Sequence, residues 1–440
     1  MKRTNILGWV CLMVMSFLVM SLPLVWASSH QSIQQNLGSS SFEEVPGFIW
    51  EETYGGPNWE WCRDMIEIST GGFAMTGFTD PTGSTNGGRL WLVRVDEDGT
   101  QLWNRTYTDD ESGGHSLVEC SSGGFAMAGA LFFSNPLHQE MLLVRTDVDG
   151  NHLWNRTYYG SASTSCFDMI ECSDGGFALL GWQNIGDDSD LILVRTDADG
   201  NQIWNQTYGF DGNEYPGFHG LTQCSDGGFA LAGDTWSFNS DAQLYVVRTD
   251  STGNELWNLT LGETGFETAT SIVTVGSELQ IVAQRLDSVQ QLSLVWLIRI
   301  DTDGAVVWER TYGSANHMGI AESMIQCSTG GFALAGFGGD PFSQSMGAWL
   351  LRIDDNGNLL WDQIYDRSDR DEIYAIVECS DGGFALAGQT EVDWSEGDFD
   401  FWLLRVADEA PPIPIEWIVA GVGVPIVVIV LAVVIRARRK

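Results

Sequence analysis

One position of an internal repeat carries a different, chemically active side chain in most copies. Five residues before a recurrent cysteine position, the copies read Arg63, His115, Phe167, His219, Thr270, Glu322 and Tyr374. If the repeats form a ring, these groups converge near a channel mouth, where they could hold a polar ligand. We therefore take Arg63, His115, His219, Glu322 and Tyr374 as candidate ligand-binding residues. Ordinary divergence of unconstrained positions explains the variation equally well.

Tryptophans in segments of variable length form a second set of candidates. Trp182, Trp236 and Trp394 each lie between the second and third strand-like runs of their copy. Exposed indoles beside polar groups can stack on sugar rings or on peptide side chains. These three residues predict a binding face made of loops, on the same side as the varied ring.

The acidic residues assign no catalytic site. A glycoside hydrolase needs two carboxylates ~5–9.5 Å apart across a cleft. Asp109, Asp110, Asp187, Asp188 and Glu322 are available, but nothing in the sequence pairs them. Two carboxylates that converge at the channel mouth would favour an enzyme.

The cysteines and acidic turns predict neither a metal site nor a cofactor. Five cysteines share one repeat position where two other copies hold Ile68 and Val275, namely Cys120, Cys172, Cys224, Cys327 and Cys379. Replacement by Ile and Val indicates buried thiols, and equivalent positions of adjacent units do not meet the ~4.4–6.8 Å Cα separation of a disulfide. Metal-ligand spacing such as Cys-x-x-Cys is absent from the sequence. The Asp197–Gly200 turn is too short for an EF-hand loop, so we interpret it as a hairpin turn.

Four glycosylation sequons follow the recurrent tryptophan directly, at Asn104, Asn155, Asn205 and Asn258. Side chains alternate along a strand, so these asparagines face solvent if this strand is the outermost of its sheet. They are therefore candidate glycan sites. Repeat duplication that happens to preserve Asn-x-Thr is the alternative.

These residues are positioned by a repeat that runs through most of the chain. A tryptophan recurs every 50 to 53 residues at Trp50, Trp103, Trp154, Trp204, Trp257, Trp308 and Trp361. Each copy holds four strand-like runs, in the third copy Asp168–Cys172, Gly176–Gly181, Leu191–Asp197 and Gln202–Tyr208. Turn residues that tolerate positive φ separate the runs. The pattern predicts an all-β fold, a seven-bladed β-propeller of four-stranded blades.

The two ends of the array predict how the ring closes. The array opens with a lone strand at Phe48–Tyr54 and stops after the third strand of the last copy, at Arg405-Val406. If the first strand completes the last blade, no sheet edge remains at the seam. An open solenoid would need capping repeats, and neither end resembles a cap.

The segments that flank the array predict export and anchoring. Residues 1–27 have the basic start and apolar run of a signal peptide, and 28–47 form a flexible segment. The propeller spans 48–408, and 409–416 form a Pro-rich spacer. Residues 417–435 carry no charge and are long enough to cross a bilayer as a helix, followed by a basic cytoplasmic tail, 436–440. We expect a single-pass protein of the cell membrane with an extracellular propeller and a cytoplasmic C-terminus.

The exported part is strongly acidic. Six of the 21 basic residues lie in the two terminal segments and all 59 acidic residues lie between them, which leaves a net formal charge of −44 there. Such a field repels polyanions, so nucleic acid is excluded as a partner.

The repeat Asp-Gly-Gly-Phe-Ala-Leu-Ala-Gly, then Trp-Leu-Leu-Arg-x-Asp-x-x-Gly-Asn, then Trp-x-x-Thr-Tyr-Gly resembles that of uncharacterised propeller proteins on archaeal and bacterial surfaces. More distantly it resembles quinoprotein-type propellers, which implies that the recurrent tryptophan docks neighbouring blades. The resemblance covers about residues 48–408 and specifies fold far better than function. We favour a surface binding or adhesion module for a glycan or an envelope protein. Its C-terminal helix would hold the module on the cell membrane. The alternative is an extracellular glycoside hydrolase or quinoprotein-like oxidoreductase. The absence of an adjacent Cys-Cys pair argues against the oxidoreductase.

Overall fold

The computed structural model describes residues 47–408 apart from 57, 81–87, 109, 135–136, 159–162, 187, 239–240, 263–264, 288–291, 314–317, 340–345, 369 and 394–397. The chain divides into Met1–Ser41 and Phe42–Lys440, and every described residue belongs to the second unit. The predicted signal peptide, spacer, membrane segment and cytoplasmic tail lie outside the described residues. Of the predicted flexible segment 28–47, only Gly47 is described. Among the described residues, no helix has the length and apolarity needed to span a membrane.

The described part is built of four-stranded antiparallel meanders, and the third one illustrates them. Strands β10 (Thr164–Glu171), β11 (Phe177–Ile185), β12 (Asp188–Thr196) and β13 (Gln202–Tyr208) pair in chain order. In the turn between β10 and β11, the Cys172 N–H donates to the Gly176 carbonyl. Gly175 in this turn has a φ of +80°, which favours glycine. Turn chemistry in the repeat thus produces the meander.

The same order recurs along the chain. The other meanders are β2 (Glu60–Glu67), β3 (Phe73–Thr79), β4 (Arg89–Val95), β5 (Gln101–Tyr107); β6 (Ser112–Glu119), β7 (Phe125–Ser134), β8 (Leu137–Thr146), β9 (His152–Tyr158); β14 (Glu214–Gln223), β15 (Phe229–Thr235), β16 (Gln243–Thr249), β17 (Glu255–Leu261); β18 (Glu267–Val275), β19 (Glu278–Asp287), β20 (Leu292–Ile300), β21 (Val306–Tyr312); and β22 (Met318–Gln326), β23 (Phe332–Gly339), β24 (Gly347–Ile353), β25 (Leu359–Tyr365). A parallel bridge between His219 and Ser271 joins β14 to β18, so two of these meanders form one eight-stranded sheet.

The remaining sheet combines the two ends of the array. Strands β26 (Asp371–Glu378), β27 (Phe384–Asp393) and β28 (Asp398–Val406) are completed by β1 (Phe48–Tyr54), which pairs antiparallel with β28. The pairing runs from Phe48↔Val406 to Tyr54↔Phe401. The predicted closing strand is therefore present, with the predicted bounds.

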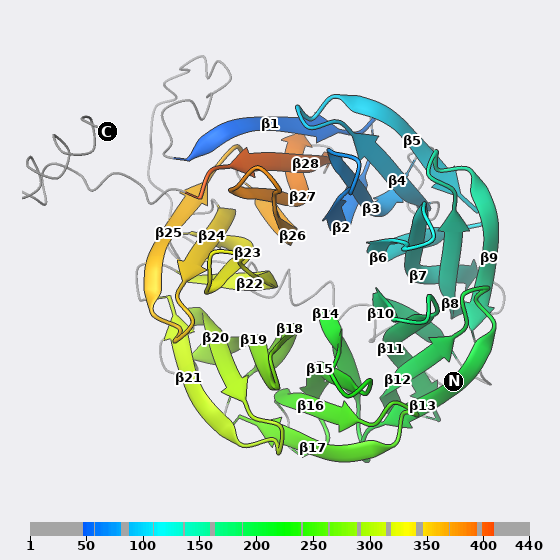
Figure 1. The fold of residues 1–440 in the computed structure, drawn as a ribbon, viewed down its shortest axis with the longest axis vertical. Coiled ribbons are helices and arrows are strands. Elements are labelled where there is room, and N and C mark those ends of the chain that lie inside the picture. Colours follow the sequence, from blue (N-terminus) through cyan, green and yellow to red (C-terminus); the bar gives the residue numbers. More distant parts are fainter. Residues whose placement is uncertain are drawn as a thin grey trace, which may run out of the picture. The chain divides into compact units, whose positions relative to one another are not determined.

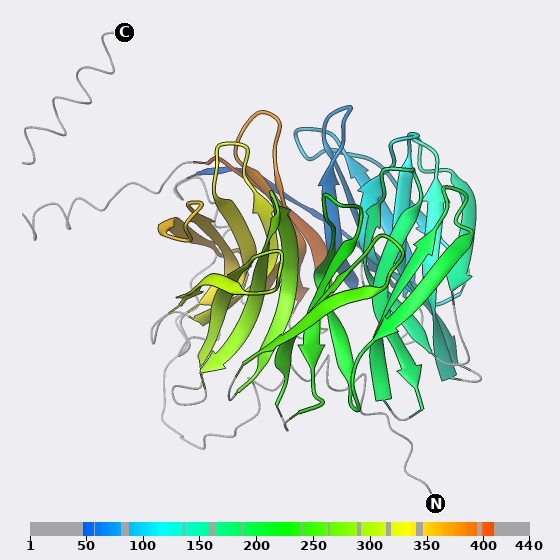
Figure 2. The same cartoon turned by 60° about the horizontal axis from the view of Figure 1, so that its bottom comes forward.

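The meanders are arranged in a ring around a common axis, which we call the channel, with the first strand of each meander innermost and its fourth strand, β1 in the closing sheet, outermost (Figure 1). Figure 2 shows the strands running between the two faces of this ring. The apolar core lies between neighbouring sheets: Met141 and Leu143 of β8, for example, share one buried cluster with Phe177 and Leu179 of β11. Each sheet thus buries both faces against its neighbours.

In most outermost strands, a recurrent tryptophan and a recurrent tyrosine contact a turn of the next sheet. Atoms of the Trp103 indole occupy the space where a Cβ on Gly150 would stand, and the Tyr107 hydroxyl donates to the Gly150 carbonyl at 2.7 Å. Gly150 has a φ of +74°, a backbone conformation that favours glycine. A larger residue there would therefore strain the backbone and also clash with the Trp103 ring. The same tyrosine bond recurs from Tyr54, Tyr158, Tyr208 and Tyr312 to Gly99, Gly200, Gly253 and Gly357.

Strand β17 departs from this pattern and compensates for it. It ends in Leu261 where other copies hold tyrosine, so no hydroxyl is available. Instead, the Trp257 indole N–H donates to the Thr302 carbonyl of the next turn at 2.9 Å. One neutral hydrogen bond therefore replaces another at the same junction.

Two predictions about recurrent residues are confirmed. The seven described cysteines are free, and all except the half-buried Cys224 are buried. The Asp197 carboxylate accepts the N–H groups of Asp199 and Asn201, at 3.0 and 2.8 Å. Its own turn therefore satisfies this carboxylate, as expected for a hairpin turn rather than a calcium loop.

The predicted loop between β11 and β12 is wrong. Trp182 lies within β11, where it pairs with Leu191, and the hairpin continues to the pair Ile185↔Asp188. The predicted runs ended at Gly181 and resumed at Leu191, because polar residues in this stretch mask the strand pattern. Cross-strand pairing to the hairpin tip overrides that local polarity.

Candidate functional site

The varied ring lies at a β-bulge in the innermost strands. Pairing skips one residue in six of these strands, and the skipped residues are Arg63, His115, Phe167, Thr270, Glu322 and Tyr374. In β14 the irregularity is longer, from Pro216 to Leu221, and it includes Phe218 and His219. A bulge leaves its extra residue unpaired and re-aims the side chain. The variation in sequence therefore coincides with one repeated backbone feature.

Five bulge residues pack together as a cluster that we call the channel plug: Arg63, His115, Phe167, Phe218 and Tyr374. The Arg63 guanidinium lies 5.0 Å from the Phe218 ring and 4.5 Å from the Tyr374 ring. Phe218 also contacts Phe167, with ring centroids 4.9 Å apart, and His115, at 5.9 Å. Phe218 stands at the centre of the plug, next to the predicted His219. It was missed because the bulge in β14 is longer than the repeat suggests.

The polar groups of the varied ring are largely engaged within the protein. The Nδ1 atom of His115 lies 2.6 Å from the Cys166 carbonyl, and burial lowers the pKa of His115 to about 4. The Nε2 atom of His219 lies 2.9 Å from the Tyr374 carbonyl. Because a carbonyl only accepts, both nitrogens must donate. The structure thus brings the two histidines to separate carbonyls of the ring.

The other polar members of the varied ring also interact with groups of the protein, namely Tyr374, Thr270 and Glu322. The Tyr374 hydroxyl donates to Glu372 at 2.6 Å, and the Thr270 hydroxyl donates to the Ala321 carbonyl at the same distance. Glu322 is half-buried. Its pKa is raised to about 7 by burial, which the charge of Arg63 partly opposes.

Two tryptophans that the sequence did not single out lie next to the plug: Trp61 is on β2, and Trp59 directly precedes this strand. The rings of Trp59 and Trp61 are stacked, with centroids 6.2 Å apart and planes 11° apart, and the Arg63 guanidinium lies 5.0 Å from the Trp61 ring. Trp59 is 41% exposed. The buried Nε1 atom of Trp61 has no hydrogen-bond partner among the described residues. The sequence contained a signal for Trp61, because a residue two positions before Arg63 on a strand points to the same side as Arg63.

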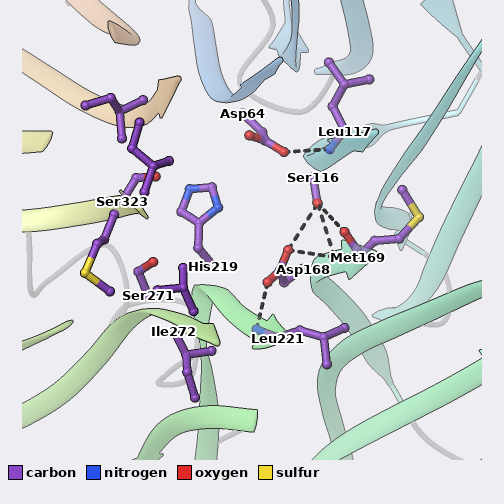
Figure 3. A pocket seen from close by; sticks show the side chains of 14 residues that line it. Asp64, Ser116, Leu117, Asp168, Met169, His219, Leu221, Ser271, Ile272 and Ser323 are labelled. Carbon is purple, nitrogen blue, oxygen red and sulfur yellow. Dashed lines mark hydrogen bonds between the residues drawn. The ribbon is translucent and has the colours of Figure 1, made fainter. Parts of the chain in front are cut away.

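A cavity of about 240 Å³ lies beside the varied ring, within the channel (Figure 3). Its polar lining comprises Asp64, Ser116, Asp168, His219, Ser271 and Ser323, and its apolar lining includes Leu117, Met169, Ile272, Met324 and Ile376. In six strands the residue that follows the bulge is Asp64, Ser116, Asp168, Ser271, Ser323 or Ala375. A run of small and acidic residues at one repeat position was the signal in the sequence.

Hydrogen bonds hold both carboxylates of the cavity. Asp64 accepts the N–H of Leu117 on the next innermost strand at 2.7 Å. Asp168 accepts the N–H of Leu221 at 2.8 Å and that of its own neighbour Met169 at 2.8 Å (Figure 3). Burial raises the pKa of Asp168 to about 7, an effect that His219 opposes. The two carboxylates are therefore positioned, and one of them titrates near neutrality.

The remaining candidates lie apart from the plug. Trp182 is half-buried in β11. Trp236 follows β15, where its indole N–H donates to Asp234 at 2.7 Å and its ring meets Phe266 edge-on at 5.1 Å. Trp394, Asp109 and Asp187 lie outside the described residues, whereas Asp110 and Asp188 are exposed.

The four sequon asparagines all lie on outermost strands. Asn104, Asn155, Asn205 and Asn258 belong to β5, β9, β13 and β17, and each is exposed. The Asn258 side chain donates to Glu255 at 2.7 Å. The predicted solvent exposure of these side chains is confirmed.

The buried carboxyls predict that mild acid stabilises the fold. Burial raises the pKa of Asp168, Asp234 and Glu322 to about 7 and that of Asp190 to about 6. Between pH 5 and 7 the folded state therefore binds more protons than the unfolded state, so stability falls as pH rises through this window. His115 acts in the opposite direction, because its lowered pKa favours unfolding below about pH 6.5.

We expect the melting temperature of the full chain to be higher at pH 5.5 than at pH 8, measured by circular dichroism. Asp168→Asn should reduce this difference, whereas the same change at the exposed Asp199 should not. A melting temperature that rises steadily from pH 5.5 to pH 8 would contradict the raised pKa of these carboxyls.

Among the described residues, no group of three or more His, Cys, Asp or Glu side chains could hold a metal ion. An anionic quinone cofactor does not fit the cavity either, since its charge would face Asp64 and Asp168. The chemistry available here is hydrogen bonding, ring stacking and attraction of cations.

Comparisons with known proteins support the fold. The profile of the family described as outer membrane protein assembly factor BamB matches residues 189–383. A puromycin hydrolase structure aligns with a TM-score of 0.50 at 13% identity, covering 84% of this chain and 57% of the hydrolase chain. Sqt1 from Chaetomium thermophilum aligns with a TM-score of 0.48 at 11% identity, covering 83% and 99%. No curated protein sequence matches. The repeated four-stranded sheets, the profile match over residues 189–383 and the likeness to the hydrolase structure together support a β-propeller fold.

Proposed function

We propose that this protein is a membrane-anchored, extracellular propeller of seven blades that binds a sugar at the mouth of its channel. The stacked pair Trp59 and Trp61 beside Arg63 carries the proposal. Trp59 offers an exposed face on which a pyranose ring can stack.

Several features support the extracellular location and the number of blades. Residues 1–27 and 417–435 have the patterns of a signal peptide and a membrane helix. The exposed sequons at Asn104, Asn155, Asn205 and Asn258 are placed for glycans, whose occupancy the intact mass of the purified chain would reveal. Seven recurrent tryptophans and the parallel bridge at a single position, His219↔Ser271, support seven blades, two of them joined.

The binding test uses the full chain in detergent and an array of immobilised oligosaccharides. Trp59→Ala and Trp61→Ala should each weaken sugar binding about threefold to tenfold, the worth of one stacking contact. Trp236→Ala is the matched control, because its indole N–H already has a partner in Asp234. If Trp236→Ala abolishes binding and Trp59→Ala does not, the loop face is the site and the mouth is not.

A protein ligand is the alternative to a sugar at the channel mouth. The family matched over residues 189–383 is described as an outer-membrane protein assembly factor. Retention of envelope proteins by the full chain, with no retained sugar, would favour this alternative over the sugar.

A hydrolase is the second candidate, because Asp64 and Asp168 do converge on one cavity. One carboxyl with a raised pKa beside another is the arrangement of an acid and its partner. We rank it lower since both oxygens of Asp168 accept backbone N–H groups from Met169 and Leu221. Release of aryl alcohol from aryl glycosides by the full chain, lost in Asp168→Asn, would reverse this ranking.

A further inference from the structure

We propose that the channel cavity is a second binding site, which takes a small organic ammonium ion. The proposal is independent of sugar binding at the mouth. It rests on the residues that line the cavity, on two serine hydroxyls that bond to no described residue, and on the charge of the channel end beyond it.

The cavity combines two carboxylates with apolar walls. Asp64 and Asp168 come from β2 and β10, and the intervening strand β6 contributes Ser116, whose hydroxyl donates to Asp168 at 3.3 Å. Ile272, Met324 and Ile376 supply a surface for an alkyl chain. Carboxylates that keep hydrogen-bonding capacity beside apolar walls match an ammonium head and its chain.

Two serine hydroxyls of the lining have no hydrogen-bond partner among the described residues. Ser271 is 1% exposed and Ser323 is 5% exposed, and both line the cavity (Figure 3). No hydrogen bond joins either hydroxyl to another group of the described residues. Because both residues line the cavity, a ligand or a water there can hydrogen-bond with these hydroxyls. Each serine can accept one N–H of an ammonium group.

His219 is already engaged at Nε2, which donates to the Tyr374 carbonyl 2.9 Å away. An ammonium ion has three donors and no acceptor, which fits a lining of carboxylates and hydroxyls.

The channel end beyond the cavity favours entry of cations. Four innermost strands end in glutamates, Glu67, Glu119, Glu171 and Glu378. Each accepts the N–H of a serine in a neighbouring turn, as in Ser121 to Glu171 at 2.8 Å. These bonds hold a ring of negative charge around the channel end, which raises the local concentration of cations. Arg63 lies in the plug, with its guanidinium held between aromatic rings.

The lining selects an organic cation over a metal ion. Among the described residues, no cluster of three or more His, Cys, Asp or Glu can hold a metal. The volume of about 240 Å³ accommodates a short alkyl chain together with water. Filling by water alone is the competing outcome.

Calorimetric titration of the full chain with n-butylammonium chloride tests the proposal, with n-butanol as the neutral probe. We expect saturable binding of the ammonium and none of the alcohol. Asp168→Asn should weaken the ammonium at least about tenfold, the worth of one hydrogen bond to a charged group. Asp188→Asn, an exposed acid outside the cavity, should leave the affinity unchanged.

Two further variants keep the test decisive if Asp168→Asn fails to fold. Ser271→Ala and Ser323→Ala remove hydroxyls that have no partner in the described part of the chain, so they should fold as the unchanged chain does. Each should weaken the ammonium severalfold while sugar binding at the mouth persists. Failure of n-butylammonium to bind, or an affinity in both serine variants equal to that of the unchanged chain, would overturn the ammonium site and leave the sugar proposal standing.

Discussion

Deletion of residues 48–54 is expected to unfold the whole propeller rather than to trim one edge. These residues form β1, which pairs with β28 from Phe48↔Val406 to Tyr54↔Phe401. The deletion also removes the Trp50 and Tyr54 contacts with Gly99 of the neighbouring sheet. Both the last sheet and the seam with the first are lost, so the effect should approach the whole stability of a typical domain, about 5–15 kcal/mol.

The measurement is thermal unfolding of the full chain, followed by circular dichroism, with and without residues 48–54. Deletion of residues 28–34, which precede the first strand, is the matched control and should leave the melting temperature unchanged. Tyr54→Phe removes one seam hydrogen bond, to Gly99 at 2.6 Å, and should have a small effect of about 1 kcal/mol. If the deletion of 48–54 melts like the unchanged chain, the ring does not depend on this seam.

Trp204→Ala is expected to cost about 3 kcal/mol, near the lower end for loss of a large aromatic side chain. Trp204 lies half-buried on β13, and its indole fills the space where a Cβ on Gly253 would stand. The ring also meets Phe229 of the next sheet edge-on, with centroids 6.1 Å apart. The variant therefore leaves a void between two sheets.

The cost should lower the melting temperature by roughly 5 °C or more, as measured by calorimetry. Trp59→Ala is the matched control, because Trp59 is 41% exposed and should lower it little. Gly253→Ala tests the same contact between sheets and should also lower the melting temperature. A Cβ there would meet the Trp204 ring, and the φ of +82° at Gly253 disfavours alanine. A larger loss from Trp59→Ala than from Trp204→Ala would mean that the recurrent tryptophans do not dock the sheets.

Local turn chemistry explains why the meanders could be predicted. The Cys172 to Gly176 turn and the Asp197 turn are closed by residues a few positions apart, so their structure follows from short-range sequence. The closing strand Phe48–Tyr54 was predicted with correct bounds for a related reason. The last copy of the repeat lacks its fourth strand, and the lone strand at the start of the array can supply it. Free buried cysteines followed from the alternation of Cys with Ile68 and Val275.

Contacts in the channel could not be predicted in the same way. The varied ring was found, but not that its members meet around Phe218, because a bulge of irregular length in β14 moves this residue out of register. Asp64 and Asp168 were overlooked since they stand one position beside the varied ring. Trp182 was misplaced because pairing along β11 and β12 extends farther than local polarity suggests.

The sequence by itself thus determined the repeat, the four-strand order within each copy, the closing strand and the role of the glycine turns. Each of these depends on interactions over short distances or on a period that the chain repeats. Only the tertiary structure decided which innermost residues meet across the channel, such as Arg63 with Tyr374 and Asp168 with the Leu221 N–H. Those contacts join residues from different sheets, and their geometry depends on bulges and on the packing of neighbouring sheets, which no local pattern records.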